Sequence, residues 1–189
     1  TNTSLGGMRF YPSCSQLYTT YPELSITMKT GATGFLEQEV LQGNIDIAYV
    51  LGHPDQKNLQ YIQKGKDELV IIGKEVINHE HFTDAIHQQN LLFTSLDCCY
   101  STTLDQIYSD YNLNKGEFTH INDYEALINF TQLGMGISMV TKSLAKKFGI
   151  QYYIDVPEQY RHIGLYLIAR NDHVFTPIEK QFIGLNDAL

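Results

Sequence analysis

The sequence predicts an α/β fold that contains two successive β-α-β runs. Short apolar runs with strand character alternate with segments of helical periodicity along nearly the whole chain. Gly-rich or hydroxyl-rich loops separate several of these strands from the helices that follow them. This alternation is typical of a mostly parallel sheet whose strands are connected by helices.

The first run occupies roughly the first 50 residues. Residues 5–21 are expected to form a helix with Ser4 as its N-cap, and residues 24–29 a strand. Gly31 and Gly34 then break the strand ahead of a second helix. Gly43 follows this helix in the C′ position, where positive φ is common, and residues 45–50 continue as a largely apolar strand.

Two further strands are expected over residues 58–64 and 68–73, and a weak helix over residues 79–90. The second β-α-β run then begins with a strand at residues 91–94. The remaining expected elements are a helix from about Ser101 to Tyr111, a strand at 118–121, a helix at 123–133 with Asn122 as its cap, a strand at 136–140, a helix at 141–148 closed by Gly149, a strand at 162–169, and a helix at 175–185 opened by Thr176 and Pro177.

The charge balance argues against direct binding of nucleic acid by this segment. The chain of 189 residues has a formal net charge of −8 and 18% charged residues. A chain of this kind offers no basic stripe that could neutralise a phosphate backbone. If the protein binds DNA, another part of it is expected to do so.

The three cysteines, Cys14, Cys98 and Cys99, are too few and too unevenly spaced for a disulfide framework. An odd, small number of cysteines favours a reducing, cytoplasmic location. No apolar run reaches the length of a membrane-spanning helix. The sequence therefore predicts a cytoplasmic protein without a membrane partner.

An ordered succession of motifs resembles one known family. Tyr21-Pro22, the loop Thr30 to Gly34, and Leu41-Gln42-Gly43-Asn44-Ile45-Asp46-Ile47-Ala48 come first. They are followed by Cys98-Cys99-Tyr100-Ser101, by Gly134-Met135-Gly136, and by the strand at 162–169. In this order and spacing they resemble the effector-binding domain of LysR-type transcriptional regulators.

The resemblance implies a type II periplasmic-binding-protein-like architecture: two Rossmann-like subdomains joined by two crossover strands. Subdomain I is expected to be discontinuous, comprising residues 1–66 and 162–189, and subdomain II to comprise residues 67–161. The family places a winged helix-turn-helix, a linker helix and a first strand before this region. The chain is therefore expected to be a sensor domain without its DNA-binding part, beginning just after the first strand.

The implied function is ligand-controlled regulation of transcription in a bacterium. A small polar or anionic effector is expected to bind in the cleft between the lobes and to act allosterically. The family implies a homodimer, a tetramer in the full-length protein, and DNA binding only through the amino-terminal domain. The alternative is a solute-binding protein of a transport system, which shares the two-lobed architecture.

The candidate effector site consists of loops at strand ends that are rich in hydroxyl and amide groups. Such groups beside helix amino termini bind carboxylates or polar molecules, because free N–H groups and the helix dipole favour negative charge there. Carried over from the family pattern, or chosen from these loops, the candidates are Thr1, Ser4, Thr33, Leu51, His53, Ser95, Cys99, Tyr100, Ser101, Thr102 and Asn122. The structural alternative is that these hydroxyls cap their own helices.

The class of effector stays open at this point. Many family members carry an arginine at the crossover or after the Cys-x-Tyr motif, where this chain has Leu51 and Ser101. Without a guanidinium, bidentate capture of a carboxylate loses its best partner, although His53 offers a partial replacement. Of the two classes of effector, an anionic metabolite is only slightly favoured over a neutral one.

Other chemistries have weaker support. A helix amino terminus at Cys98-Cys99 would lower a thiol pKa and favour oxidant sensing, but small semi-buried thiols are the favoured interpretation. The histidines His79, His81 and His87 match no metal-binding motif. We expect no metal and no cofactor, and no nucleophile, acid and base can be named together, so the chain is not expected to be an enzyme.

Overall fold

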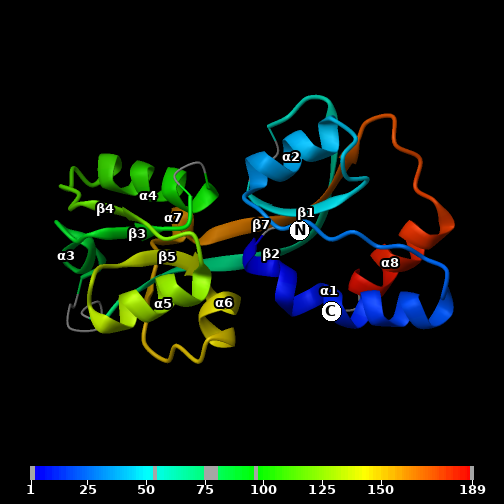
Figure 1. The fold of residues 1–189 in the computed structure, drawn as a ribbon. Helices are drawn as coiled ribbons and strands as arrows, with labels where there is room; N and C mark the ends of the chain where they lie inside the picture. Colours follow the sequence, from blue (N-terminus) through cyan, green and yellow to red (C-terminus); the bar gives the residue numbers. More distant parts are fainter. Residues whose placement is uncertain (1–2, 53–54, 75–80, 96–97, 188–189) are drawn as a thin grey trace. The chain divides into compact units, whose positions relative to one another are not determined.

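The structure is a computed structural model that describes residues 3–52, 55–74, 81–95 and 98–187 (Figure 1). The chain divides into two compact units. Unit 1 comprises Thr1–Gly65 and Leu165–Leu189, and unit 2 comprises Lys66–Gly164. Two strands, β2 (Leu59–Ile72) and β7 (His162–Arg170), each run from one unit into the other along the chain.

Unit 1 packs helices against a sheet in which β7 lies between β1 and β2. Its remaining elements are α1 (Thr3–Thr20), α2 (Thr33–Leu41), β1 (Ala48–Gly52) and α8 (Pro177–Asp187). One part of its core forms where α2 meets the sheet, through Leu36, Val40, Ala48, Val50, Leu59 and Ile168. A second part is an aromatic cluster of Phe10, Tyr49 and Phe182, with ring centroids 4.6 to 6.3 Å apart.

Unit 2 contains α3 (Phe82–Ile86), β3 (Leu91–Phe93), α4 (Cys99–Asp110), β4 (Phe118–His120), α5 (Tyr124–Leu133), β5 (Ser138–Thr141), α6 (Lys142–Lys147), β6 (Ile154–Asp155) and α7 (Glu158–Arg161). The last part of β2 pairs antiparallel with β5 and with β6, whereas β3 and β4 pair in parallel. Leu91 forms a single parallel bridge to Ile137.

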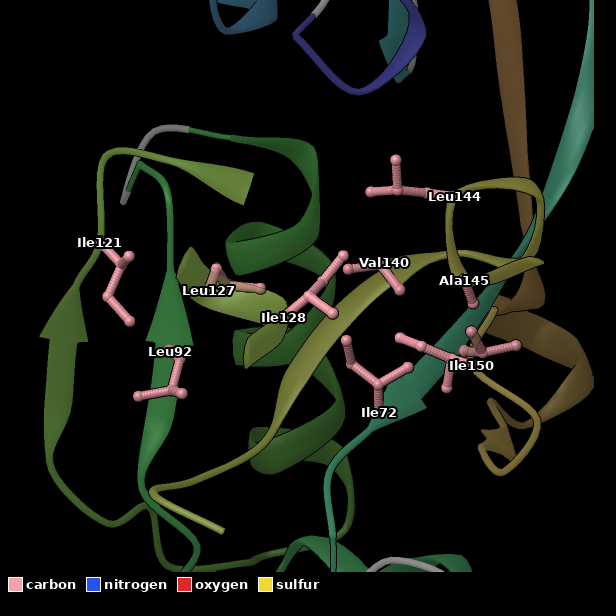
Figure 2. Close-up of a cluster of buried hydrophobic side chains, with 10 residues drawn as sticks. Ile72, Leu92, Ile121, Leu127, Ile128, Val140, Leu144, Ala145 and Ile150 are labelled. Carbon is pink, nitrogen blue, oxygen red and sulfur yellow. The ribbon is translucent and has the colours of Figure 1, made fainter. Parts of the chain in front are cut away.

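The core of unit 2 is built around the buried end of β2 (Figure 2). Val70 and Ile72 are fully buried, and they belong to one cluster with Leu92, Ile121, Leu127, Ile128, Val140, Leu144, Ala145 and Ile150. Side chains from β2, β3, α5, β5 and α6 meet there. The apolar run predicted as a strand at residues 68–73 therefore forms the centre of this unit.

Several local predictions are confirmed. Gly43 and Gly149 have φ of +74° and +69°, the left-handed region that favours glycine after a helix. Thr176 and Glu179 form the expected capping box: the Thr176 N–H donates to Glu179 Oε2 (2.6 Å), and the Glu179 N–H to Thr176 Oγ1 (3.2 Å). The helix predicted at 141–148 is present as α6 (Lys142–Lys147), with Thr141 as its N-cap and not its first residue, accepting a hydrogen bond from the Leu144 N–H.

Other local predictions are wrong. Ser4 lies inside α1, because the helix already begins at Thr3. Asp123, not Asn122, caps α5, since its carboxylate accepts from the Ala126 N–H. The separate strands predicted at 58–64 and 68–73 are one continuous strand, β2. The strand runs through Gly65 without a turn.

Residues 24–29 form no strand, and β1 begins at Ala48 instead of Ile45. Both segments have the composition of strands, but a strand exists only where a neighbour accepts and donates its backbone hydrogen bonds. Among the described residues no strand pairs with residues 24–29. None of the described helices combines the length and apolar composition needed to cross a bilayer.

A nearly buried carboxyl group lies on α2. Glu37 is 6% exposed, and its Oε1 accepts a hydrogen bond from the Tyr61 hydroxyl at 2.8 Å. Burial raises the pKa of Glu37 and the Tyr61 hydrogen bond only partly opposes this, while the negative charge of Asp55 adds to the increase. The ionised Glu37 carboxylate is therefore less favourable in the folded chain than in the unfolded chain.

Replacing Ile72 by Ala should destabilise the chain by about 2–5 kcal/mol, because it leaves a cavity in the core of unit 2. Urea unfolding followed by circular dichroism measures this loss. Ile62→Ala is the matched control, since Ile62 lies on the same strand with 37% of its surface exposed. Equal losses in the two variants would show that β2 is not the centre of the core.

Replacing Glu37 by Gln should flatten the pH dependence of stability. Its pKa is raised by folding, so the folded chain binds the proton more tightly, and stability falls as pH rises from the ordinary pKa of a carboxyl group through the raised pKa of Glu37. Removing the ionisable group removes that fall. Glu39→Gln on the same helix should have the opposite effect, because hydrogen bonds from Lys29 and Asn44 lower the pKa of Glu39. Unchanged pH profiles in both variants would contradict these assignments.

Candidate functional site

In unit 1, the candidate site is built around the amino terminus of α2. Thr33 is the first residue of this helix, and its hydroxyl donates a 2.7 Å hydrogen bond to the carbonyl of Leu51 in β1. The N-cap residue, Ala32, provides no side-chain cap, and the first turn contains no acidic residue. A helix amino terminus of this kind favours a polar or negative group.

The structure brings together two predicted site residues, Thr33 and Leu51, but in a way that differs from the prediction. The Leu51 side chain is 1% exposed, so it belongs to the core and does not line a ligand surface. Its contribution is the carbonyl that orients the Thr33 hydroxyl. Ser4 lies in the first turn of α1, and Thr1 and His53 lie outside the described residues.

In unit 2, the corresponding feature is the amino terminus of α4. Cys98 is the N-cap residue and makes no side-chain cap, and no acidic residue occupies the first turn. The hydroxyls of Ser101 and Thr102 donate to the Cys98 carbonyl at 2.8 and 3.4 Å. Thr103 donates in the same way to the Cys99 carbonyl. These hydroxyls thus bond backwards along their own helix and do not cap its N–H groups.

Burial divides the predicted residues of unit 2 into two groups. Tyr100 and Ser101 are each 3% exposed, so their side chains pack inside the unit. A role of Tyr100 in effector binding stays a prediction, and its low exposure means that only a small part of the ring can be reached from outside. Thr102 and Asn122 are exposed, and Ser95 is half-buried.

The strand pair β3–β4 gathers polar groups close to the same helix terminus. These strands are parallel, with Phe93 opposite His120, so their carboxyl ends lie at one edge of the sheet. Thr94 and Ser95 follow β3, and Asn122 follows β4. His120 Nε2 lies 2.8 Å from the Thr94 carbonyl.

His120 lies in the candidate loop at residues 119–123 but was not singled out from the sequence as a site residue. It is exposed and ends a predicted strand, at the edge where the other candidates gather. The sequence already indicated this residue, because ligands often contact polar residues at the carboxyl ends of parallel strands. The register that pairs it with Phe93 could be read only from the structure.

Burial makes the Cys99 thiol harder to ionise than an ordinary thiol. Burial raises the pKa of Cys99 to about 12, and the neighbouring Cys98 adds to this increase, while the N–H groups of Cys99 and Tyr100 only partly oppose it. Cys98 is buried and Cys99 half-buried, and both are free cysteines. The helix amino terminus does not produce the lowered thiol pKa that would favour reactivity, because desolvation is the larger effect.

A search of the described residues for groups of three or more His, Cys, Asp and Glu side chains that could bind a metal finds none. The predicted loops therefore offer neutral donors and helix N–H groups to a ligand. Their chemistry suits reversible binding of a polar or anionic molecule more than a covalent step.

Curated proteins that are similar to this chain are named as transcriptional regulators. The HTH-type transcriptional regulator CzcR of Bacillus anthracis is 27% identical over 173 residues, covering 89% of this chain and 59% of that protein. YofA of Bacillus subtilis, also named an HTH-type transcriptional regulator, is 24% identical over 168 residues, covering 86% and 57%. The chain thus spans a little over half the length of the curated relatives it matches.

Solved structures with the same fold come from the same group of proteins. The regulatory domain of CcmR from Synechocystis PCC6803, in complex with 2-PG, has a TM-score of 0.80 at 14% identity, covering 99% of this chain and 93% of that one. The BenM effector-binding domain with its effector benzoate has a TM-score of 0.73 at 18% identity, covering 98% and 87%. The effector-binding domain of QuiR with shikimate has a TM-score of 0.72 at 15% identity, covering 99% and 92%.

These likenesses establish the fold, which is the type II periplasmic-binding-protein-like architecture expected from the sequence. The family model described as the LysR substrate binding domain matches residues 1–186, which is nearly the whole chain. The chain belongs to the LysR substrate binding domain family.

Proposed function

We propose that this chain is the effector-sensing domain of a LysR-type transcriptional regulator. It binds a small polar or anionic molecule and controls transcription allosterically, while a separate amino-terminal domain of the full-length protein binds DNA. The proposal includes a homodimer that assembles into a tetramer, acting in the cytoplasm. Membership of the family and the names of its regulator relatives support it.

One observation carries the ligand-binding part of the proposal. The two helix amino termini that the sequence singled out, those of α2 and α4, lack a side-chain cap and lack acidic residues in their first turns. By contrast, α5, α6 and α8 are capped by their own Asp123, Thr141 and Thr176. A helix amino terminus without a side-chain cap is a favourable place for a ligand oxygen.

The chemistry of these termini favours an oxygen-rich effector. Benzoate and shikimate, the molecules named with BenM and QuiR, are carboxylates, and a carboxylate accepts hydrogen bonds from several donors at once. At the α2 terminus the nearest basic residue along the chain, Lys29, forms an ion pair with Glu39. We therefore propose recognition by hydroxyl and backbone N–H groups, which also allows a neutral polar effector.

The mechanism follows from a general property of two-state proteins. A ligand shifts the population toward the conformation that it binds more tightly, and the shift is limited by that difference in affinity. Residues 1–66 with 162–189 and residues 67–161 are proposed as the two subdomains whose arrangement responds to the effector. The resulting change reaches DNA only through the amino-terminal domain.

Neither a transport nor an enzymatic role is favoured. The relatives that match are named as transcriptional regulators, and none of those cited above is named as a transport protein. A catalytic role for Cys99 lacks support, because burial raises the pKa of its thiol to about 12 and so disfavours the nucleophilic thiolate.

Thermal unfolding of the 189-residue chain with a panel of small carboxylates, including benzoate and shikimate, tests the proposal. An effector at about 100 times its Kd stabilises the folded chain by about 2.7 kcal/mol, which appears as a raised Tm. A panel in which neither carboxylates nor neutral polar metabolites raise the Tm would count against the proposed function.

Replacing Thr33 by Val should weaken binding of any effector found in this way by roughly tenfold, because it removes the hydroxyl at the α2 terminus. Isothermal titration calorimetry measures the change. Thr33→Ser keeps the hydroxyl and should restore most of the affinity.

Thr19→Val is the matched control for this series. The Thr19 hydroxyl also bonds a backbone carbonyl, that of Ser15 at 3.0 Å, but it lies on the exposed face of α1. If Thr33→Val and Thr19→Val leave the affinity equally unchanged, Thr33 is not part of the effector site.

Replacing Thr102 by Val should reduce effector affinity more than replacing Thr103 by Val does. Both hydroxyls bond backbone carbonyls at the start of α4, but Thr102 is the more exposed. Because the two changes are chemically identical and one residue apart, their effects on helix stability should be similar. A larger loss of affinity at Thr103 would place the ligand elsewhere.

A further inference from the structure

One buried carboxyl group lies close to the candidate site of unit 1. Of the charged side chains whose burial the structure describes, only that of Glu37 is buried, with 6% of the residue exposed. Charged groups are rarely buried in this way, because an ionised carboxylate loses its hydration. A buried carboxyl group beside a binding site is therefore a candidate for a functional role.

Glu37 lies on the same face of α2 as Thr33. The two residues are four positions apart, so their side chains are neighbours on the helix surface, with Cβ atoms about 5–6 Å apart. Thr33 bonds the Leu51 carbonyl in β1. Glu37 accepts from the Tyr61 hydroxyl in β2, so this face of α2 is turned toward the sheet. Because helical side chains tilt toward the amino terminus, the Glu37 carboxyl extends toward the first turn of α2.

The Tyr61 hydroxyl is held between two groups. It donates to Glu37 Oε1 at 2.8 Å and accepts a hydrogen bond from the Gln56 N–H at 3.3 Å. The Tyr61 ring packs edge-on against Tyr166 of β7, with the ring centroids 6.1 Å apart. These contacts fix the Tyr61 side chain, which in turn holds the Glu37 carboxyl in place between α2 and the sheet.

The surroundings of Glu37 favour its protonated form. Burial raises the pKa of Glu37, the Tyr61 hydrogen bond only partly opposes this, and the negative charge of Asp55 in the loop before β2 adds to the increase. The next carboxyl on α2, that of Glu39, differs, because the Lys29 ammonium binds it and lowers its pKa. One further negative charge near Glu37 would raise the pKa of Glu37 again.

We propose that Glu37 determines the charge of the effector that the α2 site accepts. When an anionic effector binds at the amino terminus of α2, the Glu37 carboxyl takes up a proton from solvent. While this carboxyl is ionised, the site favours a neutral polar effector. The inference rests on the proposed function, because it concerns the same effector site.

Thermodynamic linkage gives the direction of the effect. An anion at the first turn and the Glu37 carboxylate repel each other, and burial of the carboxyl strengthens this repulsion. Protonation of Glu37 removes the repulsion, so the anion and the proton each bind more tightly in the presence of the other. Affinity for an anion is therefore highest below the pKa of Glu37 and falls as pH rises through it, whereas affinity for a neutral molecule stays constant.

A designed charge at the N-cap position tests the coupling without any ligand. Ala32→Asp places a carboxylate at the amino terminus of α2, and Ala32→Asn places a neutral side chain of nearly the same shape there. Both new residues are good N-caps, so the two variants differ mainly in charge. The pKa of Glu37, measured by NMR titration of isotope-labelled glutamate side chains, should be higher in Ala32→Asp than in Ala32→Asn by at least about 0.5.

Glu39 is the internal control in the same spectra. It lies two residues further along α2 and is paired with Lys29, so its pKa should differ less between the two variants than that of Glu37. Equal pKa values of Glu37 in the two variants would overturn the proposal. So would a change at Glu39 as large as that at Glu37, because it would indicate a general effect of the added charge.

A pair of ligand probes tests the same coupling at the effector site. Benzoate is the anionic probe, and benzamide is a neutral molecule of nearly the same shape. Above the pKa of Glu37, Glu37→Gln should bind benzoate about tenfold more tightly than the unchanged chain, since a coupling that moves the pKa by about one changes the affinity about tenfold. Its affinity for benzamide should not change. Glutamine keeps an oxygen that accepts from Tyr61, so the substitution removes the charge and keeps the contact.

The pH profile separates this role from a structural one. In the unchanged chain the affinity for benzoate should fall as pH rises through the pKa of Glu37, and in Glu37→Gln it should not depend on pH over that range. The same profile in both chains contradicts the proposal, as does an equal change in affinity for benzamide. If neither probe binds either chain, the proposed function loses support, and the comparison of Ala32→Asp with Ala32→Asn alone decides the role of Glu37.

Discussion

The burial of a single strand segment determines the architecture of unit 2. The last four residues of β2, Leu69–Ile72, are each at most 1% exposed and pair with both β5 and β6. Val70 and Ile72 belong to the cluster that joins α5, α6 and β3, so one short apolar run organises most of the unit. Burial of this much aliphatic surface supplies the main favourable term in folding such a domain.

The candidate site depends on how backbone hydrogen-bonding groups are satisfied. At α2 and α4 the first-turn N–H groups have no side-chain cap, and Thr33 and Ser101 direct their hydroxyls to carbonyls. The amino termini of α2 and α4 carry hydrogen-bonding groups that suit a ligand. In our proposal the effector binds there.

Fold prediction succeeded where the evidence was local. The turn after α2 requires a residue with positive φ, and Gly43 supplies it; the start of α8 has its own capping box in Thr176 and Glu179. It failed where the outcome depended on distant residues. The strand at 24–29 needed a partner, and the cap of α5 moved by one residue to Asp123, because Asn and Asp have similar cap preferences that the sequence cannot separate.

By itself, the sequence determined the α/β class, the family, and the two helix termini that carry the candidate site, because periodicity, glycine positions and capping residues act within a few neighbours along the chain. Only the tertiary structure decided which candidates are accessible. Leu51, Tyr100 and Ser101 became core residues, and His120 joined the edge where β3 and β4 end. The physical reason is that burial and strand register arise from contacts between residues far apart in the sequence, and no local pattern encodes those contacts.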